Sequence, residues 1–247
     1  MQELREPRHS HDGLIHGILY PKSKEGIPFR EHDRMAMDSR EPSLTSADNK
    51  HAALRRWTRR HLGQLDHELR VADIADTIFT LTRGRHGLGV AHRRLLALAA
   101  IVHDVGRVDG EGGHEIVGAK MILRDELLPL TGSERRALAY LTRYHRGDVP
   151  DAGKDRVLSE SDDHDALCAT LALLRAADAL DSRSLESPRL VFALRANRLR
   201  VACYLDEESA KARRVYRRRK KFRLLEELLE CRVEIDVRCA EALSMVA

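Results

Sequence analysis

The chain has 247 residues, of which 43% are apolar and 4% aromatic, and its 43 Lys and Arg face 39 Asp and Glu. A chain of this length can bury one sizeable core, and its abundance of Ala, Leu and Arg favours helices over a β-sandwich. The net charge of +4 is compatible with small anions or a phosphate-rich polymer and diagnostic of neither. No apolar run approaches the roughly 18 residues of a membrane span, so we expect no membrane helix.

The first 48 residues are polar and proline-rich, and no hydrophobic period persists in them. Their histidines match no standard spacing of metal ligands. These histidines are His9, His11, His16 and His32. We expect residues 1–48 to form a flexible or loosely docked extension. Because they lack the apolar segment of a signal peptide, we also expect no export.

The cysteines form neither a metal motif nor a disulfide framework. There are four of them, with no CxxC pair: Cys168, Cys203, Cys231 and Cys239. Most therefore read as reduced packing residues, which is typical of a cytoplasmic protein.

Residues 49–187 are predicted to form a helical core. Apolar residues recur at helical spacing from residue 46 to Gly63, and over 65–82, 95–104, 114–128, 133–146 and 166–180. Residues 83–89 and 147–164 are predicted as loops. The glycines of 83–89 do not follow a strand, so they are a weak signature for phosphate binding.

The pattern changes at Pro188, where we expect a small α+β appendage over 188–247. Two alternating segments flank Ala196 and Asn197, as in a β-hairpin, and residues 231–237 alternate again as a third strand. Between them a basic helix is predicted over 207–230. Its run Arg213–Arg223 is either a solvated helix face or a grip for RNA or polyphosphate.

Several metal-ligand residue types lie at the ends of apolar helices. His103 and Asp104 end the run LLALAAIVHDVG, and buried His and Asp are rare unless they are paired or hold a metal. His67 and Asp178 lie on other apolar helices, and His114 and His145 lie on the helices between. A helical bundle can project such side chains inward as a cage for Mn, Fe, Co or Zn.

These residues resemble the H…HD…D signature of the HD superfamily, whose members are mostly metal-dependent phosphohydrolases with an all-α core. More specifically, five segments resemble in order the helical HD-like domain of the exopolyphosphatase/guanosine pentaphosphate phosphatase family. The segments are HELRVADIADTIF, LLALAAIVHDVGR, GHEIVGAKMIL, LTRYHRGDVP and LLRAADALDSR. The resemblance covers about residues 50–238 and implies an HD-type bundle with a β-hairpin–helix–strand appendage.

The family's main polyphosphate-cleaving activity belongs to an actin-like fold that 48 polar residues cannot supply, so the chain resembles the HD-like domain standing alone. The resemblance implies that a first divalent ion (Mn, Fe, Co, Zn or Mg) is held by four residues, namely His67, His103, Asp104 and Asp178. His114 and His145 are expected to hold a second ion, with Asp104 as a catalytic bridge. Arg107 is expected to act in catalysis and to bind phosphate. Lys120, Arg143 and Arg146 are further candidates for binding the substrate.

Two functions follow as hypotheses. The favoured one is a metal-dependent phosphohydrolase that cleaves a phosphate ester or anhydride of a nucleotide or similar small polyanion. The alternative is a non-catalytic module that binds polyphosphate, a guanosine alarmone or RNA. A nucleic-acid partner is possible but not favoured, no membrane partner is expected, and the strands of the appendage could pair across a homodimer.

Overall fold

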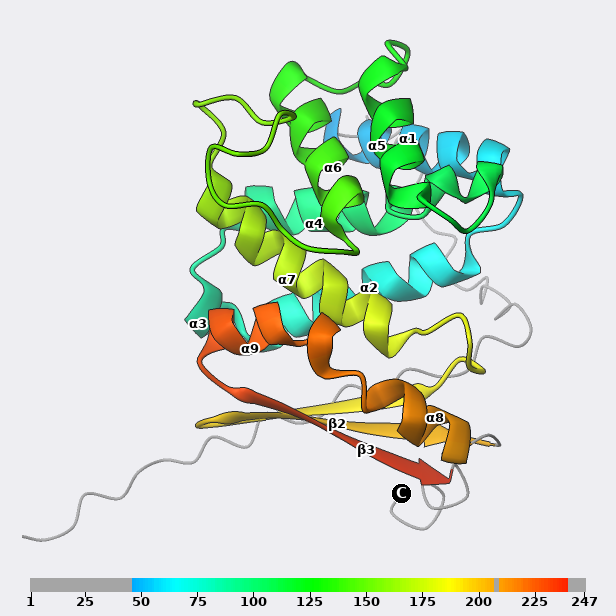
Figure 1. Ribbon diagram of the computed structural model, residues 1–247, viewed down its shortest axis with the longest axis vertical. Helices are drawn as coiled ribbons and strands as arrows, with labels where there is room; N and C mark the ends of the chain where they lie inside the picture. Colours follow the sequence, from blue (N-terminus) through cyan, green and yellow to red (C-terminus); the bar gives the residue numbers. More distant parts are fainter. Residues whose placement is uncertain (1–45, 207–208, 240–247) are drawn as a thin grey trace, which may run out of the picture.

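The computed structural model describes residues 46–206 and 209–239 (Figure 1). Most of the extension predicted for residues 1–48, including its four histidines, lies outside the described residues. The helical part comprises α1 (Ser46–Leu62), α2 (Asp66–Leu81), α3 (Arg83–His86), α4 (Val90–Val102), α5 (His114–Arg124), α6 (Gly132–Tyr144) and α7 (His164–Leu180). The fold is mainly helical, as predicted, and no described helix is long and apolar enough to cross a membrane.

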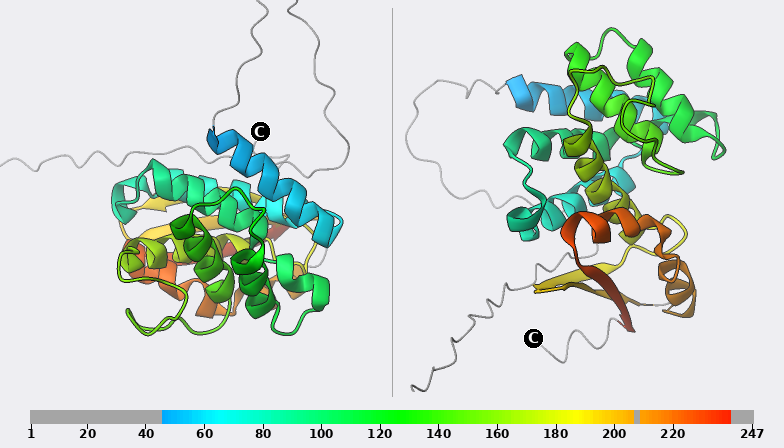
Figure 2. Two further views of the ribbon diagram at one scale, coloured as in Figure 1. Left: turned by 90° about the horizontal axis from the view of Figure 1, so that it is seen from above. Right: turned by 60° about the vertical axis from the view of Figure 1, so that its left-hand side comes forward.

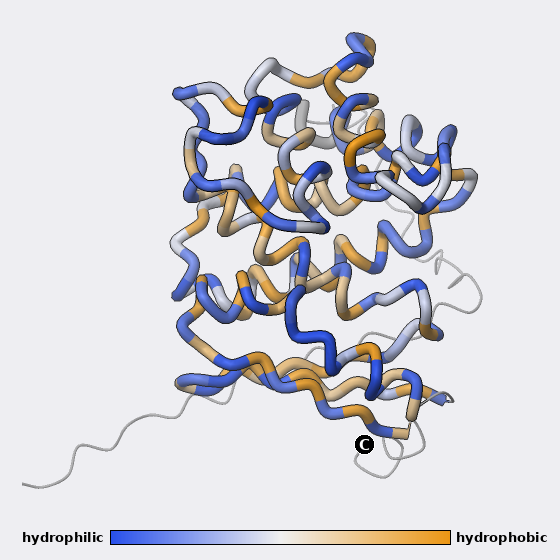
Figure 3. Tube along the Cα trace, viewed as in Figure 1, coloured by the Kyte–Doolittle hydropathy of each residue, from blue (hydrophilic) through white to orange (hydrophobic). Residues whose placement is uncertain are grey.

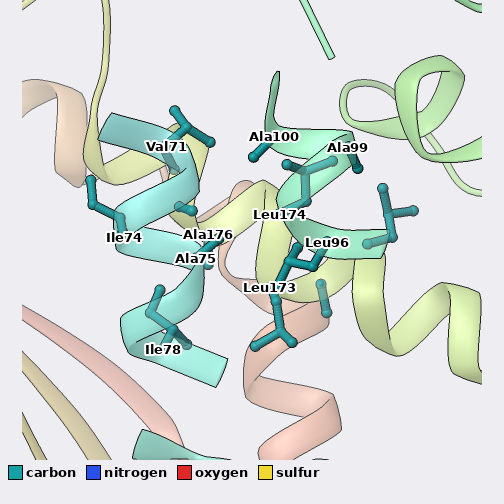
Figure 4. Packing of buried hydrophobic residues seen from close by; sticks show 14 of the residues in the cluster. Val71, Ile74, Ala75, Ile78, Leu96, Ala99, Ala100, Leu173, Leu174 and Ala176 are labelled. Atoms are coloured by element: carbon teal, nitrogen blue, oxygen red, sulfur yellow. The ribbon is translucent and has the colours of Figure 1, made fainter. Parts of the chain in front are cut away.

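The centre of the bundle is formed by α2, α4 and α7, whose apolar faces meet (Figure 4). Small residues such as Ala75, Ala99 and Ala176 let these helices approach closely, while Ile78 and Leu173 fill the space between them. All five side chains are buried. This packing fixes the ends of α2, α4 and α7, where predicted metal ligands lie.

The helix that ends in the His-Asp pair is shorter than the sequence indicated. It stops at Val102, and a 3₁₀ helix η1 (Val105–Asp109) follows. Gly106 in η1 lies directly against α5: a Cβ atom at this position would be 2.0 Å from the carbonyl oxygen of His114 and 2.4 Å from the backbone nitrogen of Gly118. Only glycine permits this contact, so it sets the position of α5 relative to the His-Asp pair.

The hairpin and the third strand are present as predicted. β1 (Arg189–Arg195) pairs with β2 (Arg198–Leu205) antiparallel, and β3 (Arg232–Cys239) pairs with β2 in parallel, giving the order β1-β2-β3. Alternate residues of each strand, such as Phe192, Val201 and Val233, are buried in the same apolar cluster as the bundle. The helices cover this face of the sheet (Figure 2). The division into a core and an appendage stays a prediction, since both share one hydrophobic cluster.

The single basic helix predicted over 207–230 is wrong. The segment forms α8 (Ser209–Tyr216), a 3₁₀ turn η2 (Arg219–Lys221) and α9 (Arg223–Leu229). Five consecutive cations, Arg217 to Lys221, repel one another in a helix, and Tyr216 and Phe222, both buried, would lie about 120° apart on one. The break lets both rings reach the core and leaves a strongly hydrophilic stretch between α8 and α9 (Figure 3).

The close contact of η1 with α5 makes a stability prediction. Gly106→Ala should lower the free energy of unfolding by about 3 kcal/mol, because backbone atoms on both sides must move. Gly112→Ala, between η1 and α5, meets nothing within 4 Å and should change the free energy of unfolding by less than about 0.5 kcal/mol. Urea denaturation of both variants measures the difference. Equal stability of the two would contradict the proposed role of Gly106.

Candidate metal centre

The six predicted metal ligands converge at the ends of five helices. His67 is the second residue of α2, His103 and Asp104 directly follow α4, His114 begins α5, His145 follows α6, and Asp178 lies in the last turn of α7. Each has no more than 8% of its surface exposed. Within this group the ligand atoms of His67, His103 and Asp104 lie within 4.8 Å of one another, as do those of Asp104, His114 and His145. Asp104 is common to both sets.

Every one of the four histidines is held through its outer ring nitrogen. The Nδ1 atoms of His103, His114 and His145 each bond the backbone carbonyl three residues earlier. The acceptors are Ala100, Glu111 and Thr142, at 2.8, 2.7 and 2.7 Å. His67 Nδ1 instead bonds Asp181 Oδ2 at 2.8 Å. In the neutral form of each ring, this acceptor fixes the proton on Nδ1, which would leave the Nε2 lone pair facing inward, as in metal-binding histidines.

The inward Nε2 atoms have poor partners within the protein. His67 Nε2 and His103 Nε2 are buried with no hydrogen bond among the described residues. His114 Nε2 and His145 Nε2 lie 3.3 Å apart, where two lone pairs would face each other. Buried polar atoms without partners cost free energy, so this arrangement suits a cation placed between the rings.

The two carboxylates present one oxygen to the histidines and the other to outer cations. Asp178 Oδ1 lies 3.4 Å from His67 Nε2, while Oδ2 accepts from Lys221 Nζ at 2.5 Å. Asp104 Oδ1 lies 3.1 Å from His114 Nε2, and Oδ2 accepts from the Nε atoms of Arg107 and Arg183 at 2.7 and 2.9 Å. These outer contacts hold each carboxylate with one oxygen free for a ligand role.

The pKa values of several groups in the cluster are strongly shifted. Burial alone would raise the pKa of Asp104, but His103 and the contacts with His114 and His145 outweigh it and hold that pKa well below its usual range. The pKa of Asp178 is also lowered against burial, by His103, His67 and Lys221. Both carboxylates are therefore ionised. Burial lowers the pKa of His145, whereas Asp104 and Asp178 outweigh burial at His103 and raise its pKa to about 9.

A cleft of about 490 Å³ opens onto the cluster. Asp104, His145 and Asp178 line its floor, and cations line its walls. The wall residues are Arg107, Arg146, Arg183, Arg218, Lys220 and Lys221. Two of the predicted substrate contacts, Arg107 and Arg146, are therefore in this cleft.

Lys120 and Arg143, the other two predicted substrate contacts, lie elsewhere. They line a separate hollow of about 360 Å³ beside α5, together with Tyr144 and Arg156. The Arg143 guanidinium stacks over the Tyr144 ring at 5.2 Å. These two cations are thus not brought together with the His/Asp cluster.

Sequence reasoning missed the residues that support the ligands. Asp181, which holds His67, also accepts from Arg70 Nε at 2.9 Å, and Arg183 bonds both Asp104 and the buried Glu68. Asp181 and Arg183 follow Asp178 in the same quoted segment, three and five residues on, which was the available signal. Lys221 could not be found, because the basic run was predicted as a continuous helix.

A family comparison matches residues 50–219 to Ppx/GppA phosphatase, domain III. The matched stretch is more than half of the chain and contains all six converging residues. The chain belongs to this family. Among curated proteins, none matches the chain. The Ppx/GppA match excludes Lys220, Lys221 and β3, so the cleft of this family member is completed by residues beyond the matched stretch.

The Glu68–Arg183 ion pair predicts that substitutions of these two residues have non-additive effects on the free energy of unfolding. Arg183→Met should lower the free energy of unfolding by about 1–3 kcal/mol, because Glu68, whose side chain is 1% exposed, loses its guanidinium partner. Glu68→Met/Arg183→Met, which replaces both partners, should be less destabilised than Arg183→Met alone.

Urea denaturation of the wild type, Glu68→Met, Arg183→Met and the double variant measures this coupling. Arg93→Met serves as the control, since its pair with Asp76 is about half exposed and should matter by less than about 1 kcal/mol. Additive effects of Glu68→Met and Arg183→Met would contradict the coupling.

Proposed function

We propose that this member of the Ppx/GppA phosphatase family is a metal-dependent phosphohydrolase of the HD type. The observation that carries the proposal is the pair of ligand sets sharing Asp104, in which the buried Nε2 atoms of His67 and His103 form no hydrogen bond within the described residues. The proposed substrate is a phosphate ester or anhydride of a nucleotide or similar small polyanion.

The donor set fits one or two divalent ions. His67, His103, Asp104 and Asp178 would hold the first, and His114 and His145 would hold the second together with Asp104. Imidazole nitrogen and carboxylate oxygen together suit Mn, Fe, Co or Zn, and Mg less so. Such an ion would polarise a phosphoryl oxygen and lower the pKa of a water molecule.

The remaining roles belong to the cations of the cleft. Arg107 and Arg183 hold Asp104 Oδ2, which keeps Oδ1 directed into the cluster. Arg146 and Arg218 are exposed, line the cleft and form no ion pair with a described side chain, so their guanidinium groups are available for phosphate oxygens. Lys120 and Arg143 would contact only a substrate that extends beyond this cleft.

The first prediction from the proposed function concerns the metal content of the protein. Protein purified without chelator should carry one or two transition-metal ions per chain, and His103→Ala/Asp104→Ala should lose them. His61→Ala/Asp165→Ala, which removes the same residue types from exposed positions, should keep them. Elemental analysis and the melting temperature with and without added Mn²⁺ measure both. If the double variant unfolds, His145→Gln tests the same site through a lower metal content.

If the wild-type protein is metal-free and cannot be reloaded with metal, the proposal of a metal-dependent hydrolase is wrong. With metal bound, release of phosphate from GTP, inorganic triphosphate or a chromogenic phosphodiester tests turnover. A metal-loaded protein that binds polyphosphate in a salt-sensitive manner without turnover would instead favour the non-catalytic binding module.

The second prediction concerns Asp181. Asp181→Asn retains the side-chain shape but weakens the acceptor for His67 Nδ1, so Mn²⁺ affinity should fall about 10–100-fold while the proposed ligands remain. Asp162→Asn, which changes a carboxylate bonded to Arg136, should leave the affinity unchanged. Calorimetric titration with Mn²⁺ measures both variants. Equal affinities would show that Asp181 has no part in positioning His67.

A further inference from the structure

The face of the sheet that points away from the helices carries six arginines and no lysine. They are Arg189, Arg195, Arg198, Arg200, Arg232 and Arg238, and the alternation of burial along the three strands places them on this face. Only two carboxylates, Glu234 and Asp236, share it. No described helix covers this face (Figure 2).

Three of these arginines lie directly opposite one another. Arg195 pairs in register with Arg198 across β1 and β2, and Arg198 pairs with Arg232 across β2 and β3. Like charges in directly opposite positions destabilise a sheet. At the strand spacing of about 4.8 Å, this arginine row spans about 10 Å.

Internal ion pairs do not neutralise the row. Glu234 accepts from Arg198 at 3.0 Å and from Arg200 at 3.2 Å, so one carboxylate serves two guanidinium groups. The side chains of Arg195 and Arg232 are exposed and form no ion pair within the described part of the chain. A sheet that keeps this repulsion at its surface is matched to an anionic partner with closely spaced charges.

We propose that this face is a docking surface for the phosphate backbone of duplex RNA. Arginine guanidinium groups suit bidentate contact with phosphate, and repeated phosphates match an extended row of cations. The proposal is independent of the hydrolase, because none of these six arginines lines the cleft.

The other residues of this face argue against single-stranded nucleic acid and membranes as partners. Tyr204, the aromatic residue of this face, is 8% exposed and lies under the Arg238 guanidinium, so no ring is free to stack on single-stranded bases. The apolar residues between the arginines are small or half-buried, Val191, Ala193 and Ala202, which gives little to insert into a membrane. A three-stranded face from which no described element projects fits the wide, shallow minor groove of A-form RNA better than the grooves of B-form DNA.

Binding of a labelled RNA duplex of about 16 base pairs to the full chain, followed by fluorescence anisotropy, tests the proposal. Arg195→Gln/Arg198→Gln/Arg232→Gln should weaken binding at least about tenfold and make the slope of log K against log salt shallower by about three units. A control with the same loss of charge, Arg59→Gln/Arg94→Gln/Arg124→Gln, removes exposed arginines outside the face and should change affinity by less than about threefold.

A charge reversal separates binding from folding. Arg232→Glu places a carboxylate opposite Arg198, so the melting temperature should stay the same or rise while RNA affinity falls. Mn²⁺ binding and phosphate release by these variants should equal those of the wild type, which distinguishes failure of this proposal from failure of the hydrolase.

Several results would overturn the proposal. They are absence of RNA binding by the wild type at about 50 mM salt, equal binding by the arginine-row and control variants, stronger binding to a DNA duplex of the same length, and binding to anionic vesicles in preference to RNA. Loss of RNA binding in Arg218→Gln, with the arginine-row variant unaffected, would assign the RNA to the cleft instead.

Discussion

The structure depends on the burial of four imidazole rings whose Nδ1 atoms are all bonded outward. Three of these bonds use the same local geometry, a histidine bonded to the carbonyl three residues before it at a helix terminus. The chain therefore needs no dedicated side chain to orient His103, His114 or His145; the ends of α4, α5 and α6 do so. Only His67 needs a partner from another helix, and Asp181 supplies it from just beyond α7.

That arrangement explains the packing around it. The contact between Gly106 and α5 allows His114 to approach Asp104, and the small residues between α2, α4 and α7 let His67 approach His103. Arginines and a lysine then balance the carboxylates from outside. A bundle with an ordinary apolar core would need none of these cations. The polar cluster therefore explains why these arginines and this lysine lie beside the buried carboxylates.

Much of this could be predicted from the sequence. Helical periodicity located the bundle, alternation around Ala196 and Asn197 located the hairpin, and apolar runs ending in His or Asp indicated the residues that converge. The separation of Lys120 and Arg143 from the cleft could not be predicted. Helical spacing in the sequence does not determine whether a side chain of α5 or α6 lies in the cleft or in a separate hollow. The break between α8 and α9 was also missed, since it depends on the burial of both Tyr216 and Phe222 against elements distant in sequence.

The parallel pairing of β3 with β2 has a consequence for the order in which the protein forms during synthesis. Parallel strands need a connection that crosses back over the sheet, and here α8, η2 and α9 form that connection and carry Arg218, Lys220 and Lys221 to the cleft. The last of the six converging residues, Asp178, is translated before any of this crossover. Since chains fold from the N-terminal side as they emerge from the ribosome, the nascent bundle presents its histidines and carboxylates before Arg218, Lys220 and Lys221 complete the cationic wall. Under the proposed function, an ion would enter the open cluster at that stage, before Lys221 pairs with Asp178.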